Sequence, residues 1–113
     1  MFRRDERLGI DLPDFTVPFE EMSVADQEDV LIRWETIRAR IPEQIMRFEN
    51  VIEDLLAAVH EEEDWDVIAM HFAEISDYAS RINELNTWRR VDQGLHPKSV
   101  EDHLAREHQA REK

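Results

Sequence analysis

Apolar side chains recur every three or four positions between Val30 and Val91, which is the period of one helix face. The pattern occurs twice, once before and once after an acidic stretch at 61–66. We therefore predict two long amphipathic helices, over 24–61 and 64–92, that fold back on each other as an antiparallel, coiled-coil-like hairpin. The apolar stripes consist of Leu31, Trp34, Ile37, Ile41, Ile45, Phe48, Ile52, Leu55 and Val59 in the first helix, and Trp65, Ile68, Phe72, Ile75, Ala79, Ile82 and Leu85 in the second, and most of these residues form the seam between the helices.

Capping residues and one proline define the ends and the middle of these helices. Ser23 precedes Val24-Ala25-Asp26, and its hydroxyl is suited to accept a free backbone N–H of the first turn. Pro42 interrupts the first helix, yet the apolar stripe keeps its phase across it, so we predict one helix kinked at Pro42. Gly94 is a suitable left-handed cap after the second helix.

The two flanking segments lack this strong helical period. Residues 1–22 mix apolar and charged side chains, and Gly9 and Pro13 interrupt any regular element, so we predict an extended N-terminal arm. Residues 94–113 contain few apolar side chains and predict a tail with a short polar helix. The fold class predicted is all-α, with 23–93 as the helical hairpin.

One edge of the hairpin carries more apolar side chains than the two helices can bury between them. With the seam labelled a and d, this is the g edge, which both helices of an antiparallel pair share. Two segments could cover it: the N-terminal arm, or the same edge of a second hairpin, which gives a homodimeric four-helix bundle. We predict the homodimer, and an interaction surface formed by Ile37, Val51, His71, Tyr78, Leu85 and Trp88.

Charge divides the hairpin into two ends. The net charge is −13, which disfavours binding to nucleic acid or to an anionic membrane surface. The turn between the helices is an acidic tip, whereas arginines collect toward the other end, a gradient that favours antiparallel association of two copies. The acidic tip consists of Glu61, Glu62, Glu63 and Asp64, and the arginines are Arg33, Arg38, Arg40, Arg81, Arg89 and Arg90.

The sequence contains no cysteine, so we expect neither disulfides nor thiolate metal ligands. No apolar run approaches membrane-spanning length, and the first residues do not have the composition of a signal peptide. These features predict a soluble, cytoplasmic protein without a membrane anchor. We also expect no cofactor and no metal.

Four carboxylates provide the only resemblance to a known family. Glu49 and Glu53, then Glu74 and Asp77, have the spacing ExxxE and ExxD. This resembles the acidic signature of the MazG-like all-α nucleotide pyrophosphohydrolases, which binds magnesium through carboxylates on two helices. The resemblance covers only these positions, and the first block lacks part of the family's run of acids. The heptad labels also place the four side chains on different faces, whereas magnesium needs oxygens brought together.

The function predicted from these features is that of a small acidic protein–protein interaction module, regulatory or scaffolding, that is not an enzyme. Its protein partner is not identified by the sequence. Two alternatives are left open. One is the metal-dependent nucleotide pyrophosphohydrolase implied by the resemblance, and the other is an acidic decoy that inhibits a nucleic-acid-binding protein.

Overall fold

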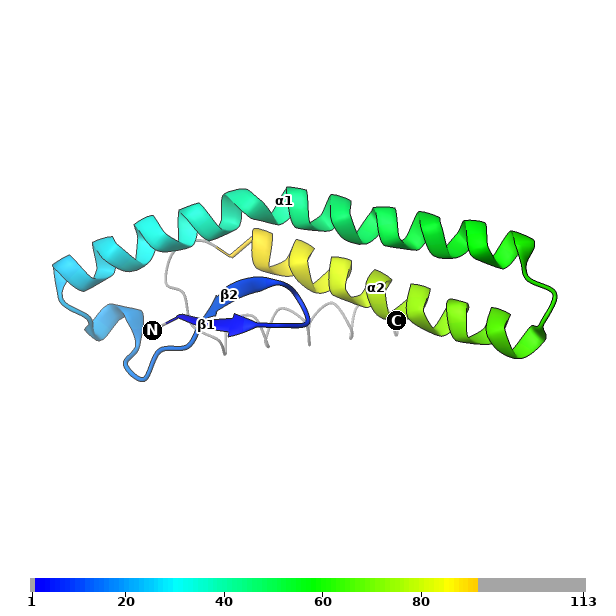
Figure 1. Cartoon of the computed structure of the whole chain (residues 1–113). Helices are drawn as coiled ribbons and strands as arrows, with labels where there is room; N and C mark the ends of the chain where they lie inside the picture. Colours follow the sequence, from blue (N-terminus) through cyan, green and yellow to red (C-terminus); the bar gives the residue numbers. More distant parts are fainter. Residues whose placement is uncertain (1, 92–113) are drawn as a thin grey trace, which may run out of the picture.

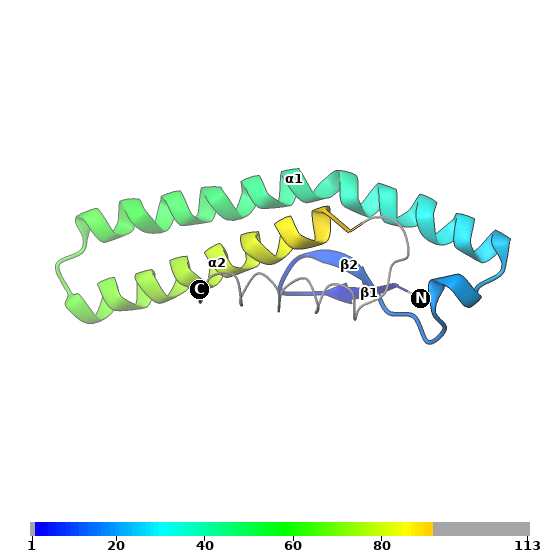
Figure 2. The same ribbon diagram turned by 180° about the vertical axis from the view of Figure 1, so that it is seen from behind.

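Two long antiparallel helices dominate the structure, a computed structural model that describes residues 2–91. Helix α1 is Val24–Glu61 and helix α2 is Trp65–Arg89, and the two pack side by side along the length of α2 (Figures 1 and 2). The predicted helical hairpin is thus confirmed. Helix α2 is shorter than the predicted 64–92, and the predicted cap at Gly94 and short helix within 94–113 lie outside the described residues.

Helix α1 begins at the predicted cap and continues through its proline. The Ser23 hydroxyl accepts a hydrogen bond from the Asp26 backbone N–H at 3.1 Å. Pro42 lies inside the helix, which is not broken there and which bends over the N-terminal segment (Figure 1). Because proline has no N–H, the Arg38 carbonyl lacks its usual helical donor.

The N-terminal segment is a β-hairpin, which corrects the extended arm predicted over 1–22. It adds a small two-stranded sheet to a mostly helical chain, so the predicted all-α class is confirmed only coarsely. Strands β1 (Phe2–Asp5) and β2 (Ile10–Pro13) pair antiparallel, with Phe2 opposite Pro13 and Asp5 opposite Ile10. Gly9 supplies the turn with a φ of 72°, a conformation that favours glycine. Gly9, predicted from the sequence to interrupt regular structure, therefore allows the strands to pair. A short 3-10 helix, η1 (Phe19–Glu21), then leads to α1.

The hydrophobic core lies where the β-hairpin meets the two helices. Trp34 and Trp88 meet edge to face with their ring centroids 5.8 Å apart, and the Trp34 indole N–H donates to the Val91 carbonyl at 2.6 Å. The core thus contains three layers: α1, α2 and the β-hairpin. The buried apolar residues are Leu8, Ile10, Val30, Trp34, Ile41, Ile45, Phe48, Leu85, Trp88 and Val91.

The other end of the helical hairpin has no such third layer among the described residues. We call it the distal half: Glu49–Glu61 of α1 and residues 65–76 of α2. Every residue of these stretches is described, and none is buried. Seam residues such as Ile52 and Ile75 are only half-buried, because two helices alone cannot enclose them. Neither long helix within 2–91 carries a stretch apolar enough to cross a lipid bilayer.

Candidate interaction surface

The structure divides the predicted g edge into a covered part and an open part. Leu85 and Trp88 are 0% and 8% exposed and belong to the core, so these two side chains are not available to a partner. Ile37 and Tyr78 are half-buried and pack against the same core. The β-hairpin thus forms the third layer over this part of the edge, which is the alternative that the sequence left open for the arm.

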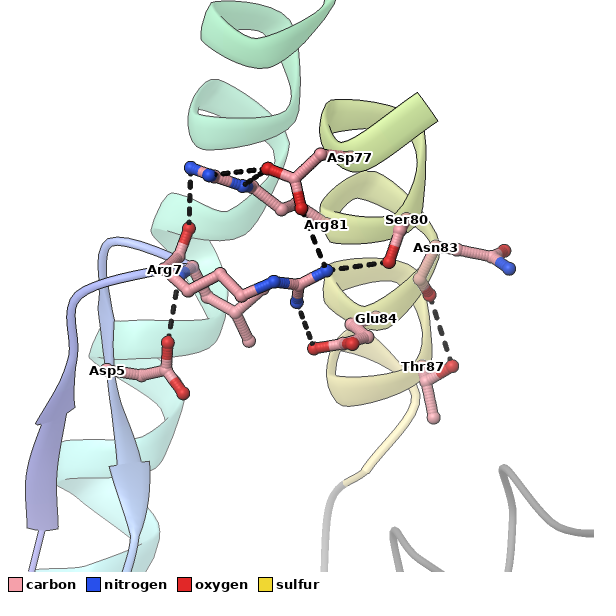
Figure 3. A network of polar contacts seen from close by, with 9 residues as sticks. Asp5, Arg7, Asp77, Ser80, Arg81, Asn83, Glu84 and Thr87 are labelled. Carbon is pink, nitrogen blue, oxygen red and sulfur yellow. Dashed lines mark hydrogen bonds and ion pairs between the residues drawn. The ribbon is translucent and has the colours of Figure 1, made fainter. Parts of the chain in front are cut away.

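Figure 3 shows the polar network that holds the turn of the β-hairpin on α2. Arg7 reaches across to three side chains of α2: Glu84 at 2.7 Å, the Ser80 hydroxyl at 2.6 Å and Asp77 at 3.8 Å. Arg81 pairs with Asp77 at 2.6 Å and donates to the Arg7 carbonyl at 3.3 Å. The two arginines therefore share one carboxylate and fix the turn in place. Sequence reasoning missed this contact because its partners are more than 70 positions apart.

An aromatic and cationic cluster marks the boundary between the covered and the open part. The Phe48 and Tyr78 rings are 5.4 Å apart, and the Arg81 guanidinium lies over the Tyr78 ring at 4.5 Å. Beyond this cluster the g edge continues with Val51 and His71, both half-buried. The Nδ1 atom of His71 is itself buried and has no hydrogen-bond partner among residues 2–91. Val51 and His71 are therefore the predicted surface residues that lie in the distal half without a third layer.

Large apolar side chains are exposed around this open part. Trp65 is 80% exposed, Met70 63%, Phe72 50% and Leu56 40%. All four lie within the distal half, whereas α2 from Leu85 onward has three buried residues. The other large apolar side chains exposed among the described residues lie elsewhere: Val17, Val24, Ile32 and Met46. The distal half thus holds half of these side chains in little more than a quarter of the described residues, and exposed apolar side chains gathered in this way are typical of a protein interaction site. The distal half is therefore the candidate interaction surface. Of the surface residues predicted from the sequence, only Val51 and His71 lie in it.

The acidic tip closes the hairpin and also leaves carboxylates free. Glu62 accepts hydrogen bonds from the backbone N–H groups of Glu63 and Asp64 at 3.1 and 3.0 Å. Asp64 caps α2 by accepting from the Asp66 N–H at 2.9 Å. Glu61 and Glu63 are exposed, and no hydrogen bond or ion pair within residues 2–91 engages their carboxylates. Two of the four tip acids thus shape the turn, and two remain free to meet a partner.

A pocket of about 360 Å³ lies between the β-hairpin and α1, at the end of the open region that is far from the acidic tip. Arg4 of β1 and Arg40 and Arg47 of α1 line it, together with Gly9, Ile10, Asp11, Ile37, Glu43 and Gln44. Arg47 pairs with Glu43 at 3.2 Å, whereas the guanidinium groups of Arg4 and Arg40 have no partner within 2–91. We call this site the arginine pocket. Its three arginines exceed the two carboxylates of the lining, Asp11 and Glu43, so the pocket has a small positive charge on a strongly acidic chain.

The carboxylates behind the pyrophosphohydrolase resemblance do not form a site. Glu49, Glu53 and Glu74 are exposed, and Asp77 is engaged by Arg81 and Arg7. Within the described residues, no group of three or more metal-ligating side chains comes together. Magnesium binding requires such convergence. The described part of the chain therefore offers no assembled magnesium site at these positions.

Comparisons of the chain with protein-family models, with curated proteins and with solved structures found no match. The distal half is therefore characterised by its own geometry: an open apolar region with the acidic tip at one end and the arginine pocket at the other. Such a surface can bind an apolar helical partner and orient it by charge.

Proposed function

We propose that this protein is a small, non-catalytic interaction module that self-associates through its distal half. Two copies would pack these halves against each other about a two-fold axis and form a four-helix bundle. One observation carries the proposal: the core ends at Phe48 and Leu85, and beyond them two amphipathic helices continue without a buried residue. A regulatory or scaffolding role fits a chain of this kind, whose assembled surface then receives a further protein partner.

The free energy available from covering this surface supports the proposal. Each large apolar side chain that becomes buried contributes about 1.5–3 kcal/mol. Trp65, Phe72 and Leu56 are at least 40% exposed in the single chain, and the half-buried seam residues would gain burial as well. The open part of α1 is about 20 Å long, counting 1.5 Å per residue from Glu49 to Glu61. This length gives a four-helix arrangement several layers of side chains.

The charge distribution favours a second copy in the antiparallel orientation. A parallel pair would bring two acidic tips together on chains that each carry a net charge of −13. An antiparallel pair separates the tips and places each beside the other chain's basic region. A two-fold axis also uses the same surface twice, so one open face on each chain is sufficient and the assembly closes as a dimer.

The mass of the full chain in solution tests this proposal directly. Light scattering after size exclusion should give twice the chain mass of 13.5 kDa at micromolar concentration. Phe72→Glu should give a monomer that is still helical, because half of the Phe72 surface is already exposed in the single chain and the added charge costs most at a partner surface. Ile32→Glu is the matched control, since Ile32 is 68% exposed on α1 outside the distal half and should leave the dimer intact.

A monomeric mass for the unmodified chain across the micromolar range would refute self-association. It would leave residues 92–113 of the same chain, or a different protein, as the occupant of the distal half. Equal loss of the dimer in Phe72→Glu and Ile32→Glu would also contradict the assignment, because it would place the contact outside the distal half.

A further inference from the structure

The acidic tip and the arginine pocket carry complementary, unpaired charges. At the tip, the exposed carboxylates of Glu61 and Glu63 have no partner within 2–91. In the pocket, the guanidinium groups of Arg4 and Arg40 have none either. Arg47 is held by the exposed Glu43 at 3.2 Å and donates to Gln44 Oε1 at 3.5 Å, both on the same helix. The two sites belong to one chain but lie at opposite ends of the open part of α1, so they cannot satisfy each other within it.

Along α1, the acidic tip and the arginine pocket lie at similar distances from the centre of the open surface, on opposite sides of it. The open part of α1 runs from Glu49 to Glu61, and its middle residue is Leu55. Arg47 and Glu61, the last residue of α1, are each seven positions from Asp54, which is next to this middle residue. In helix geometry this is about 10 Å in either direction along the axis. A two-fold axis passing beside Asp54 therefore brings Glu61 of one copy, and with it the acidic tip, to the level of Arg47 of the other.

We propose that the acidic tip of each copy docks at the arginine pocket of its partner copy, and that this contact sets the register of the dimer. The inference rests on the proposed self-association and adds to it the relative position of the two chains along their helix axes. The contact occurs twice in the assembly because of the two-fold symmetry. It pairs Glu61 and Glu63 with Arg47, and it extends toward Arg40 and Arg4 in the pocket.

The chemistry of both sites suits this contact. Guanidinium groups bind carboxylates through two parallel N–H···O hydrogen bonds, which gives direction as well as attraction. The pocket volume of about 360 Å³ is sufficient for carboxylate side chains and the water around them. Trp65 follows the tip directly and is 80% exposed, so docking of the tip also covers an aromatic side chain of the kind that anchors interfaces.

The β-hairpin gives the contact a fixed boundary. Gly9 and Ile10 line the pocket, and Gln44 holds the turn by donating from its side-chain amide to the Leu8 carbonyl at 3.0 Å. The Arg7 network holds the same turn on α2. A partner helix that slides along the open surface therefore meets a rigid β-turn beside the pocket. Apolar packing supplies attraction along the surface, and the tip and pocket select one position on it.

Charge reversal in two separate chains tests the register. Arg47→Glu alone faces two unfavourable contacts with Glu63 in its homodimer, and Glu63→Arg alone faces two with Arg47. The dissociation constant of each homodimer should be about tenfold higher than that of the unmodified protein. This increase should be larger at low salt than at high salt, because salt screens the repulsion. When the two variants are mixed, both contacts become favourable again. The heterodimer should then form in excess over either homodimer, as measured by native mass spectrometry.

The matched control uses two exposed residues away from the tip and the pocket. Arg89→Glu and Glu28→Arg reverse the same charge types on α2 and α1, and neither residue has an ion pair within 2–91. Mixing these variants should give only the statistical proportion of heterodimer. A dimer whose reversal variants behave like this control would overturn the register while leaving self-association intact. A monomeric unmodified protein would overturn both.

Discussion

Replacing Gly9 by alanine tests the turn that places the β-hairpin over the core. Gly9 has a φ of 72°, and the left-handed conformation costs a residue with a Cβ about 1–2 kcal/mol. The new Cβ would also collide with the side-chain amide of Gln44, which donates to the Leu8 carbonyl. Moving Gln44 away breaks this hydrogen bond, at a cost of about 0.5–1.5 kcal/mol. We expect Gly9→Ala to lower the free energy of unfolding by about 2 kcal/mol.

A double-mutant cycle separates the two contributions. In a Gln44→Ala chain the collision and the hydrogen bond are both absent, so Gly9→Ala should there cost only the backbone part, about 1 kcal/mol. Urea unfolding followed by far-ultraviolet circular dichroism, at one protein concentration for all four chains, measures the cycle. An equal cost in both backgrounds would refute the contact between Gly9 and Gln44. No cost in either would refute the left-handed turn.

Three further substitutions probe the helices, and urea unfolding measures each of them. Trp34→Phe removes the indole N–H that donates to the Val91 carbonyl and should cost about 1–3 kcal/mol; an unchanged midpoint would contradict this bond. Ser23→Ala removes the α1 cap and should cost about 1 kcal/mol, whereas Ser23→Asp should retain stability. Pro42→Ala restores a donor for the Arg38 carbonyl and should raise the free energy of unfolding, and a decrease would contradict this.

The helices could be predicted because their signal repeats. An apolar side chain recurs every three or four positions over more than 20 residues of each helix, and Ser23 marks the beginning of α1 independently. The β-hairpin offers no comparable signal, since each strand has only four residues and allows two alternations. Its position depends on Arg7 meeting Ser80 and Glu84 of α2, a contact that no local pattern records.

The candidate surface could be predicted only in part for the same reason. Heptad labels locate an apolar edge, but they cannot say where along that edge a third layer begins and ends. The β-hairpin covers the edge up to Tyr78, so Leu85 and Trp88 become core residues while Val51 and His71 do not. The arginine pocket was not predicted at all. It is formed by Arg4 of β1 beside Arg40 and Arg47 of α1, and the β-hairpin alone brings them together.

The confinement of the core to one end has a consequence for how the chain opens. Backbone amides near Trp34 and Leu85 should exchange with solvent only when the whole core unfolds, because both side chains are fully buried. Amides around Leu55 and Ile75 lie in two helices whose seam residues are only half-buried, so they should exchange through local opening. Association of two chains would close this region, and its exchange rates should then fall as protein concentration rises, while those at the core stay constant. The hairpin thus contains one part that folds with its own chain and another whose stability is set by concentration.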